Sequence, residues 1–113
     1  MKKEVLDRYN IHFRKRSDGR KMMNSHENWL STYFSKFREN GDLNEFIRDV
    51  DLAQENSFNE IEDPDYTITV ASAFYAYMEP SGFKVWQTST EVIIIPYPDL
   101  KVILESWKEF LLS

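Results

Sequence analysis

The sequence predicts an α+β fold: an N-terminal segment and an αα-hairpin pack on a small antiparallel three-stranded meander with a C-terminal helix. Two observations predict it. Apolar residues recur at helical spacing between residues 24 and 50 and again after residue 99, whereas the region between them is rich in β-branched and aromatic residues. The chain has 113 residues, of which 42% are hydrophobic, so we expect a single domain, residues 1–113, with a substantial core.

The first 24 residues are compatible with two patterns. Residues 9–13 alternate between apolar and polar as in a strand, and Asp18-Gly19 is a hairpin signal. Residues 5–13 also fit one face of a helix. We favour a short helix that leads into a hairpin.

Two helices are expected next. Asn24 and Glu27 have the spacing of a capping box, and Asn40-Gly41 is typical of a helix end. Asp42 is positioned to cap a second helix directly afterwards. The expected apolar faces are Trp29, Leu30, Tyr33, Phe34 and Phe37 in the first helix and Leu43, Phe46, Ile47 and Val50 in the second. The short connection predicts an αα-hairpin.

The meander follows. Residues 66–78 predict one strand, residues 79–82 ("EPSG") a turn, residues 83–87 the returning strand and residues 91–95 a third strand. The third strand is expected to be the most buried, because its apolar residues fall on both faces. The final helix has this apolar side: Leu100, Ile103, Leu104, Trp107 and Leu111.

Most aromatic residues fit amphipathic faces. We therefore expect these six in the core: Trp29, Tyr33, Phe34, Phe37, Trp86 and Trp107. Tyr75 and Tyr77 share a strand face with small residues, so that face is either lightly covered or exposed. Exposed tyrosines are typical of interfaces.

Charge is distributed unevenly along the chain. Residues 1–38 contain ten Lys/Arg against four Asp/Glu, whereas residues 39–113 contain four against fifteen. Between Arg48 and Lys84 there are eight acidic residues and no Lys or Arg. Such asymmetry bears on partners rather than on fold.

Several classes of site are disfavoured. The absence of cysteine excludes disulfides, thiolate metal sites and a cysteine nucleophile. The stretch "EIEDPD" lacks the glycine and the final glutamate of a calcium loop. His12 and His26 are expected at the surface, and we predict no catalytic residue, metal or cofactor. The basic stretch "RKRSDGRK" has the clustered Lys and Arg residues that contact nucleic-acid phosphates. We nevertheless expect a solvated loop there, or a hairpin tip that complements an acidic region of another copy or of a partner.

The candidate site is centred on the acidic stretch "ENSFNEIEDPDYTI", from Glu55 to Ile68. It is either a solvated connector or one end of a docking surface, and the long cation-free region favours the second interpretation. The predicted partner-binding residues are Asp49, Asp51, Glu55, Glu60, Glu62, Asp63, Asp65 and Tyr66.

The closing passage "EVIIIPYPDLKVILESWKEFLLS", together with the size and the acidic charge, resembles small bacterial immunity proteins of polymorphic or contact-dependent toxin systems. This resemblance implies a cognate toxin, often a nuclease, that is neutralised by tight binding. It carries no family site onto numbered residues.

The leading hypothesis is therefore a non-catalytic immunity protein or inhibitor of a basic toxin. The alternative is a phage or mobile-element protein that mimics nucleic acid or regulates a host complex, and a small carboxylate enzyme is the third hypothesis. We expect a soluble, cytoplasmic protein that binds neither nucleic acid nor membrane, because the N-terminus is too charged for a signal peptide and "VIIIPY" is too short to span a bilayer. The oligomeric state is left open.

Overall fold

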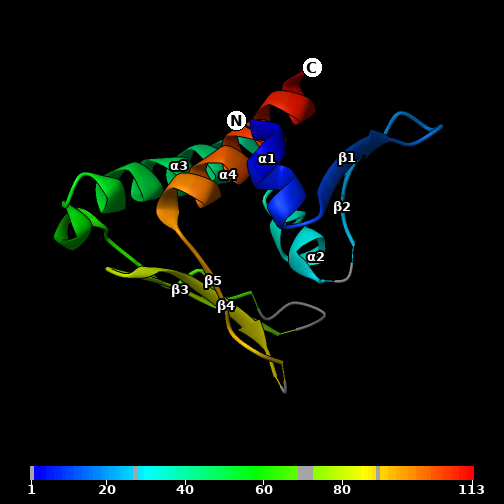
Figure 1. Cartoon of the computed structure of the whole chain (residues 1–113). Helices are drawn as coiled ribbons and strands as arrows, with labels where there is room; N and C mark the ends of the chain where they lie inside the picture. Colours follow the sequence, from blue (N-terminus) through cyan, green and yellow to red (C-terminus); the bar gives the residue numbers. More distant parts are fainter. Residues whose placement is uncertain (1, 27, 69–72, 89) are drawn as a thin grey trace. The chain divides into compact units, whose positions relative to one another are not determined.

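The computed structural model describes residues 2–26, 28–68, 73–88 and 90–113, and it confirms the α+β class (Figure 1). The chain divides into two compact units. Unit 1 contains residues 1–47 and 102–113, and unit 2 contains residues 48–101. Two helices, α3 (Asn40–Gln54) and α4 (Tyr97–Leu112), run through both units.

Unit 1 begins with the predicted helix and hairpin. Helix α1 (Lys2–Arg8) is followed by Asn10, whose φ of 56° is the left-handed conformation common after helices. Strands β1 (Ile11–Lys15) and β2 (Lys21–Ser25) then pair in antiparallel register (Figure 1). Gly19 has a φ of 91° in the connecting turn, which explains the glycine after Asp18.

The predicted helix from Asn24 is wrong in its start and its length. Asn24 lies inside β2, Glu27 lies outside the described residues, and α2 covers only Leu30–Phe34. The Ser25 hydroxyl accepts the Ser31 N–H at 2.9 Å, and the Asn28 side-chain oxygen accepts the Leu30 N–H at 2.9 Å. These oxygens supply the capping that the sequence pattern assigned to Asn24.

The predicted helix end at Asn40-Gly41 is also wrong, because α3 begins there. Gly41 does not adopt a positive φ, and the Leu43 N–H bonds the Glu39 carbonyl at 3.0 Å as in a first helical turn. The break between α2 and α3 instead lies at residues 35–39. There the Phe37 carbonyl accepts the indole N–H of Trp107 at 2.9 Å, so it does not extend α2.

The core of unit 1 contains most of the expected residues. Those that are 0–1% exposed are Leu30, Tyr33, Phe34, Leu43, Phe46, Ile103, Leu104 and Trp107, and the hairpin adds Ile11 and Met23 at 2% and 3%. The expected core residues Trp29 and Phe37 are only half-buried. The Trp107 ring also lies under the Arg38 guanidinium, 5.4 Å from its centroid, and stacks with Phe13 at 5.7 Å. Trp107 therefore fixes both the hairpin and the α2–α3 connection.

Unit 2 contains a three-stranded antiparallel sheet in the order β3-β4-β5, as the sequence predicts. Its strands are β3 (Phe74–Glu79), β4 (Gly82–Gln87) and β5 (Ile93–Ile95). A short 3₁₀ helix, η1 (Phe58–Glu60), lies between α3 and the sheet in sequence. The predicted strand over residues 66–78 is too long, since β3 begins at Phe74, and residues 69–72 of that prediction lie outside the described chain.

The expectation that the third strand is the most buried is wrong. Strand β5 pairs only with β4 among the described segments, so it is an edge strand. Val92 is 49% exposed and Ile94 is 54% exposed, whereas Ile95 is fully buried. The continuous apolar run therefore reflects an uncovered sheet face rather than burial on both faces.

Candidate functional site

One face of the unit 2 sheet carries a group of aromatic rings. Along β3 the residues Phe74, Ala76 and Met78 are buried, so the alternating Tyr75 and Tyr77 lie on the opposite face. The register places Tyr75 opposite Trp86, Tyr77 opposite Lys84, and Lys84 opposite Ile94. Residues directly opposite each other share a face. We call this surface the ring face; it consists of Tyr75, Tyr77, Lys84, Trp86 and Ile94.

The three rings contact one another. Trp86 stacks with Tyr75 at 5.7 Å between centroids and 25° between planes, and Tyr77 lies 5.9 Å from the same indole. Tyr77 is 38% exposed, while Tyr75 and Trp86 are half-buried. Lys84 reaches Glu79 with a 3.0 Å ion pair, so its charge is compensated. The ring face therefore offers preorganised aromatic surface without a net positive charge.

The end of the acidic segment, which we define as residues 55–68, forms a sheet edge beside β3. Asp65 bridges Tyr77 and Ile68 bridges Phe74, both in antiparallel geometry. Backbone bonds of 2.8 Å run from the Tyr66 N–H to the Ala76 carbonyl and from the Ile68 N–H to the Phe74 carbonyl. The end of the segment that the sequence predicts to be either a solvated connector or a docking edge is thus held in place by main-chain bonds.

Local turns also fix this edge. A side-chain oxygen of Asp63 accepts the Asp65 N–H at 3.0 Å, and one of Asp65 accepts the Thr67 N–H at 2.9 Å. Both are Asx-type bonds, which short carboxylate side chains readily form. Each uses one carboxylate oxygen, Oδ1, and Asp65 is exposed, so its charge is presented beside Tyr77 on the ring face.

The other predicted site residues divide into two groups. Glu55, Glu60 and Glu62 are exposed, as are Asp63 and Asp65, and none of these five takes part in an ion pair within the described chain. The 8% exposed Ile61 holds the stretch between Glu60 and Glu62 against the unit.

Asp49, Asp51 and Tyr66 have partners inside unit 2. Asp49 is only 7% exposed, and its carboxylate accepts a hydrogen bond from the Tyr66 hydroxyl. Asp51 forms a 2.7 Å ion pair with Lys101. The Tyr66 ring, half-buried, packs edge-on against Phe83 at 6.4 Å. These three residues therefore hold α3, α4 and the sheet edge together, and Asp49 does not present its charge to solvent.

Sequence reasoning missed Trp86 and Ile94 as surface residues. Trp86 fitted an amphipathic pattern and was expected in the core. The surface position of Trp86 can be identified from the two-residue turn at Pro80-Ser81. This turn pairs Glu79 with Gly82, which fixes the register of the two strands and puts Trp86 opposite Tyr75. The exposed position of Ile94 follows from the same count, since it lies opposite Lys84.

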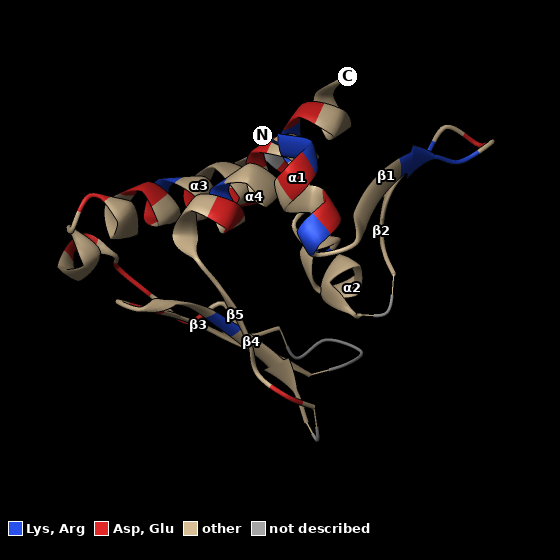
Figure 2. Cartoon of the chain, viewed as in Figure 1, with Lys and Arg blue, Asp and Glu red and all other residues tan. Residues whose placement is uncertain are grey.

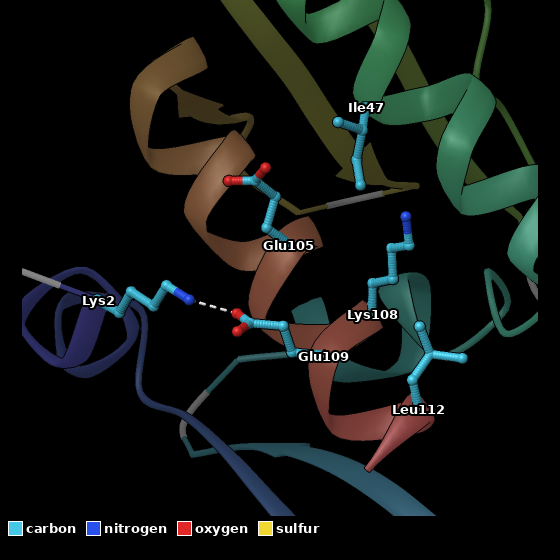
Figure 3. Close-up of a pocket in the computed structure, with 6 residues that line it drawn as sticks. All are labelled: Lys2, Ile47, Glu105, Lys108, Glu109 and Leu112. Carbon is cyan, nitrogen blue, oxygen red and sulfur yellow. Dashed lines mark hydrogen bonds and ion pairs between the residues drawn. The ribbon is translucent and has the colours of Figure 1, made fainter.

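Within the described residues no three His, Asp or Glu side chains gather as metal ligands would, and His12 and His26 are exposed. A hollow of about 370 Å³ in unit 1 is lined by Lys2, Ile47, Glu105, Lys108, Glu109 and Leu112 (Figure 3). The two lysines and two glutamates that line this hollow balance in charge, and Lys2 forms an ion pair with Glu109.

Burial raises the pKa of Tyr97 to about 12. Its hydroxyl donates to the Glu79 carbonyl and lies 3.2 Å from the Gly82 carbonyl, so it ties the start of α4 to the β3–β4 turn. Nothing reactive faces this hydroxyl in the contacts described, and its role is structural.

No protein-family model, curated protein or solved structure significantly matches this chain. In the described part of the chain, no helix combines the length and the apolar composition needed to cross a bilayer.

Proposed function

We propose that this chain is a non-catalytic binding protein whose docking site is the ring face together with the acidic segment. The single observation that supports it is the bridge between Asp65 and Tyr77, which sets an exposed carboxylate opposite the exposed ring of the aromatic group. Aromatic surface provides large contact area, and carboxylates beside rings favour guanidinium and ammonium groups. The partner class that fits is a basic protein surface.

The net charge of unit 2 supports the same class of partner. Unit 2 contains ten Asp/Glu and three Lys/Arg. Of those three cations, Lys84 and Lys101 pair with Glu79 and Asp51. A field of this sign accelerates encounter with a positively charged partner and repels nucleic acid.

The specific activity that we propose is neutralisation of a basic toxin, in the manner of the bacterial immunity proteins that the sequence resembles. A toxin that holds phosphate must be basic where it does so, and an acidic inhibitor with an aromatic anchor is its physical complement. The proposal places no bond-making step in this chain, which acts by covering the toxin's surface.

The test is protection of growth. Cells that express a candidate basic toxin from a neighbouring gene should survive only when this chain is co-expressed. Tyr77→Thr keeps a strand-forming residue but removes the ring, and it should weaken binding measured by calorimetry roughly tenfold or more. The matched control is Tyr9→Thr in unit 1, assayed at a temperature where both variants are folded. Equal affinity of Tyr77→Thr and wild type would remove the ring face from the interface.

Partner range separates this proposal from the alternative class. Binding to one cognate toxin supports an immunity protein. Displacement of DNA from many unrelated basic proteins would instead identify a nucleic-acid mimic.

A further inference from the structure

A basic tip projects from unit 1 at the end of the β1–β2 hairpin. It consists of Arg14, Lys15, Arg16 and Arg20, all of which are exposed (Figure 2). Arg16 has a 3.5 Å ion pair with Asp18 in the same turn. Lys21, the next cation, donates to the Leu111 carbonyl at 3.1 Å, so it is not part of the free tip.

The hairpin is fixed at its root and solvated at its tip. Ile11 is 2% exposed and Met23 is 3% exposed, and Phe13 stacks with Trp107 and with Phe110 at 5.4 Å. Arg14 lies next to Phe13 along the strand and therefore points to the other side. The turn is closed by the Arg16 N–H on the Arg20 carbonyl at 2.7 Å. The tip is thus a preorganised basic ribbon.

The same chain carries the complementary surface in unit 2. The ring face offers three rings for guanidinium stacking, and Asp65 presents a carboxylate opposite Tyr77. The preceding part of the acidic segment carries four more exposed carboxylates, and none of the five has an ion-pair partner in the described chain. We propose that the chain self-associates by docking the basic tip of one copy on the ring face and acidic segment of a second copy. This inference does not rest on the proposed toxin partner.

Charge complementarity favours docking of the basic tip over two other modes of association, which are binding of nucleic acid and pairing of β5 strands. Nucleic acid would meet the tip but would be repelled by a chain whose net charge is −5. Edge-to-edge pairing of β5 strands would use uncharged isoleucines and would be insensitive to salt. Docking of the tip uses opposite charges and cation–π contacts, each weak by itself, so the association is reversible and salt-dependent.

The experiment is sedimentation velocity of the full chain without any foreign protein, over a range of concentrations at low and high salt. Raising the ionic strength from about 0.02 M to about 0.3 M should weaken self-association roughly tenfold or more, because screening shortens the reach of exposed charges. A salt-insensitive dimer that is abolished by Ile94→Lys would overturn the proposal in favour of β5 pairing.

Two charge variants sharpen the test. The tip variant is Arg14→Glu/Lys15→Glu/Arg20→Glu, and the acid variant is Glu55→Lys/Glu60→Lys/Glu62→Lys/Asp65→Asn. The asparagine retains the acceptor for the Thr67 N–H. Each variant alone should be monomeric, because its tip and its docking surface then carry the same sign. An equimolar mixture should form a heterodimer, because the tip of each variant now complements the docking surface of the other.

Circular dichroism and thermal melts establish that both variants are folded. A wild type that stays monomeric at low salt and high concentration, or a mixture that does not associate, would overturn the proposal. So would a tip variant that self-associates as the wild type does. These measurements contain no toxin, so they do not depend on whether the proposed toxin partner exists. Failure of self-association and failure of the proposed function are therefore distinguishable.

Discussion

Asp65 stands directly opposite Tyr77 in an antiparallel bridge, so an exposed carboxylate and an exposed phenol ring share one face of the unit 2 sheet. Their positions follow from main-chain pairing between the acidic segment and β3. The feature that carries the functional proposal is therefore built into the fold of unit 2.

The first prediction concerns the buried acid of α3. Tyr66→Phe removes the hydroxyl that donates to Asp49 and leaves a buried carboxylate oxygen short of one donor. It should lower the free energy of unfolding by about 1–3 kcal/mol. Urea unfolding measures this loss. Asp51→Asn is the matched control, since it breaks the partly exposed pair with Lys101 and should cost less than about 1 kcal/mol. Equal effects would contradict the structural role of Tyr66.

The second prediction concerns two glycines. Gly82 has a φ of 149°, and a Cβ added there would lie 3.2 Å from Ile94 Cγ2 and 3.4 Å from the Ile95 carbonyl oxygen. Gly82→Ala should therefore destabilise the fold by about 1–3 kcal/mol. Gly41→Ala, in α3 and with open space around the added carbon, should instead stabilise it by about 0.5–1 kcal/mol. Thermal melts of both variants check the two signs, and a stabilised Gly82→Ala would contradict the β4–β5 packing.

The third prediction concerns alkaline pH. The pKa of Tyr97 is about 12 in the folded chain because burial disfavours the anion, whereas an unfolded tyrosine titrates near about 10. Above pH of about 10 the unfolded state releases this proton while the folded state retains it, so stability falls as pH rises. The contribution is complete below pH of about 10 and is lost through about 12.

Urea unfolding at a series of pH values measures that slope. Tyr97→Phe should make the slope between pH of about 10 and 12 shallower, because the substituted side chain has no proton to lose. The variant should also lose about 1 kcal/mol at neutral pH through its missing hydrogen bond to the Glu79 carbonyl. An unchanged slope would show that Tyr97 ionises in the folded chain as freely as in the unfolded one.

Periodicity in the sequence predicts much of unit 1 and the order of the sheet. The hairpin at Asp18-Gly19, the apolar face of α3 and the apolar side of α4 are found where the patterns put them. The start of α2 could not be predicted in this way. It depends on the Ser25 hydroxyl, and its end depends on a carbonyl bond to Trp107, which lies 70 positions away from Phe37 in the chain.

The candidate site was only partly predictable. Charge counting found the exposed acids of residues 55–65, but it could not separate them from Asp49, whose partner Tyr66 is 17 positions away. Hydrophobicity alone placed Trp86 and Ile94 inside, because a strand with one uncovered face and a strand with two covered faces differ little in composition. Register, which the β3–β4 turn sets, distinguishes the two cases.

The most direct test of the central claim is the rate at which the chain associates with the basic toxin that we propose as its partner, measured by stopped flow at several salt concentrations. The variant is Glu60→Gln/Glu62→Gln/Asp63→Asn/Asp65→Asn, which keeps both turn acceptors, and the control is Glu4→Gln/Asp7→Asn in α1. We predict that the first variant associates roughly tenfold more slowly at low salt and with a weaker salt dependence, while the control matches wild type. An association rate that is the same for all three proteins would contradict the acidic segment as the docking edge.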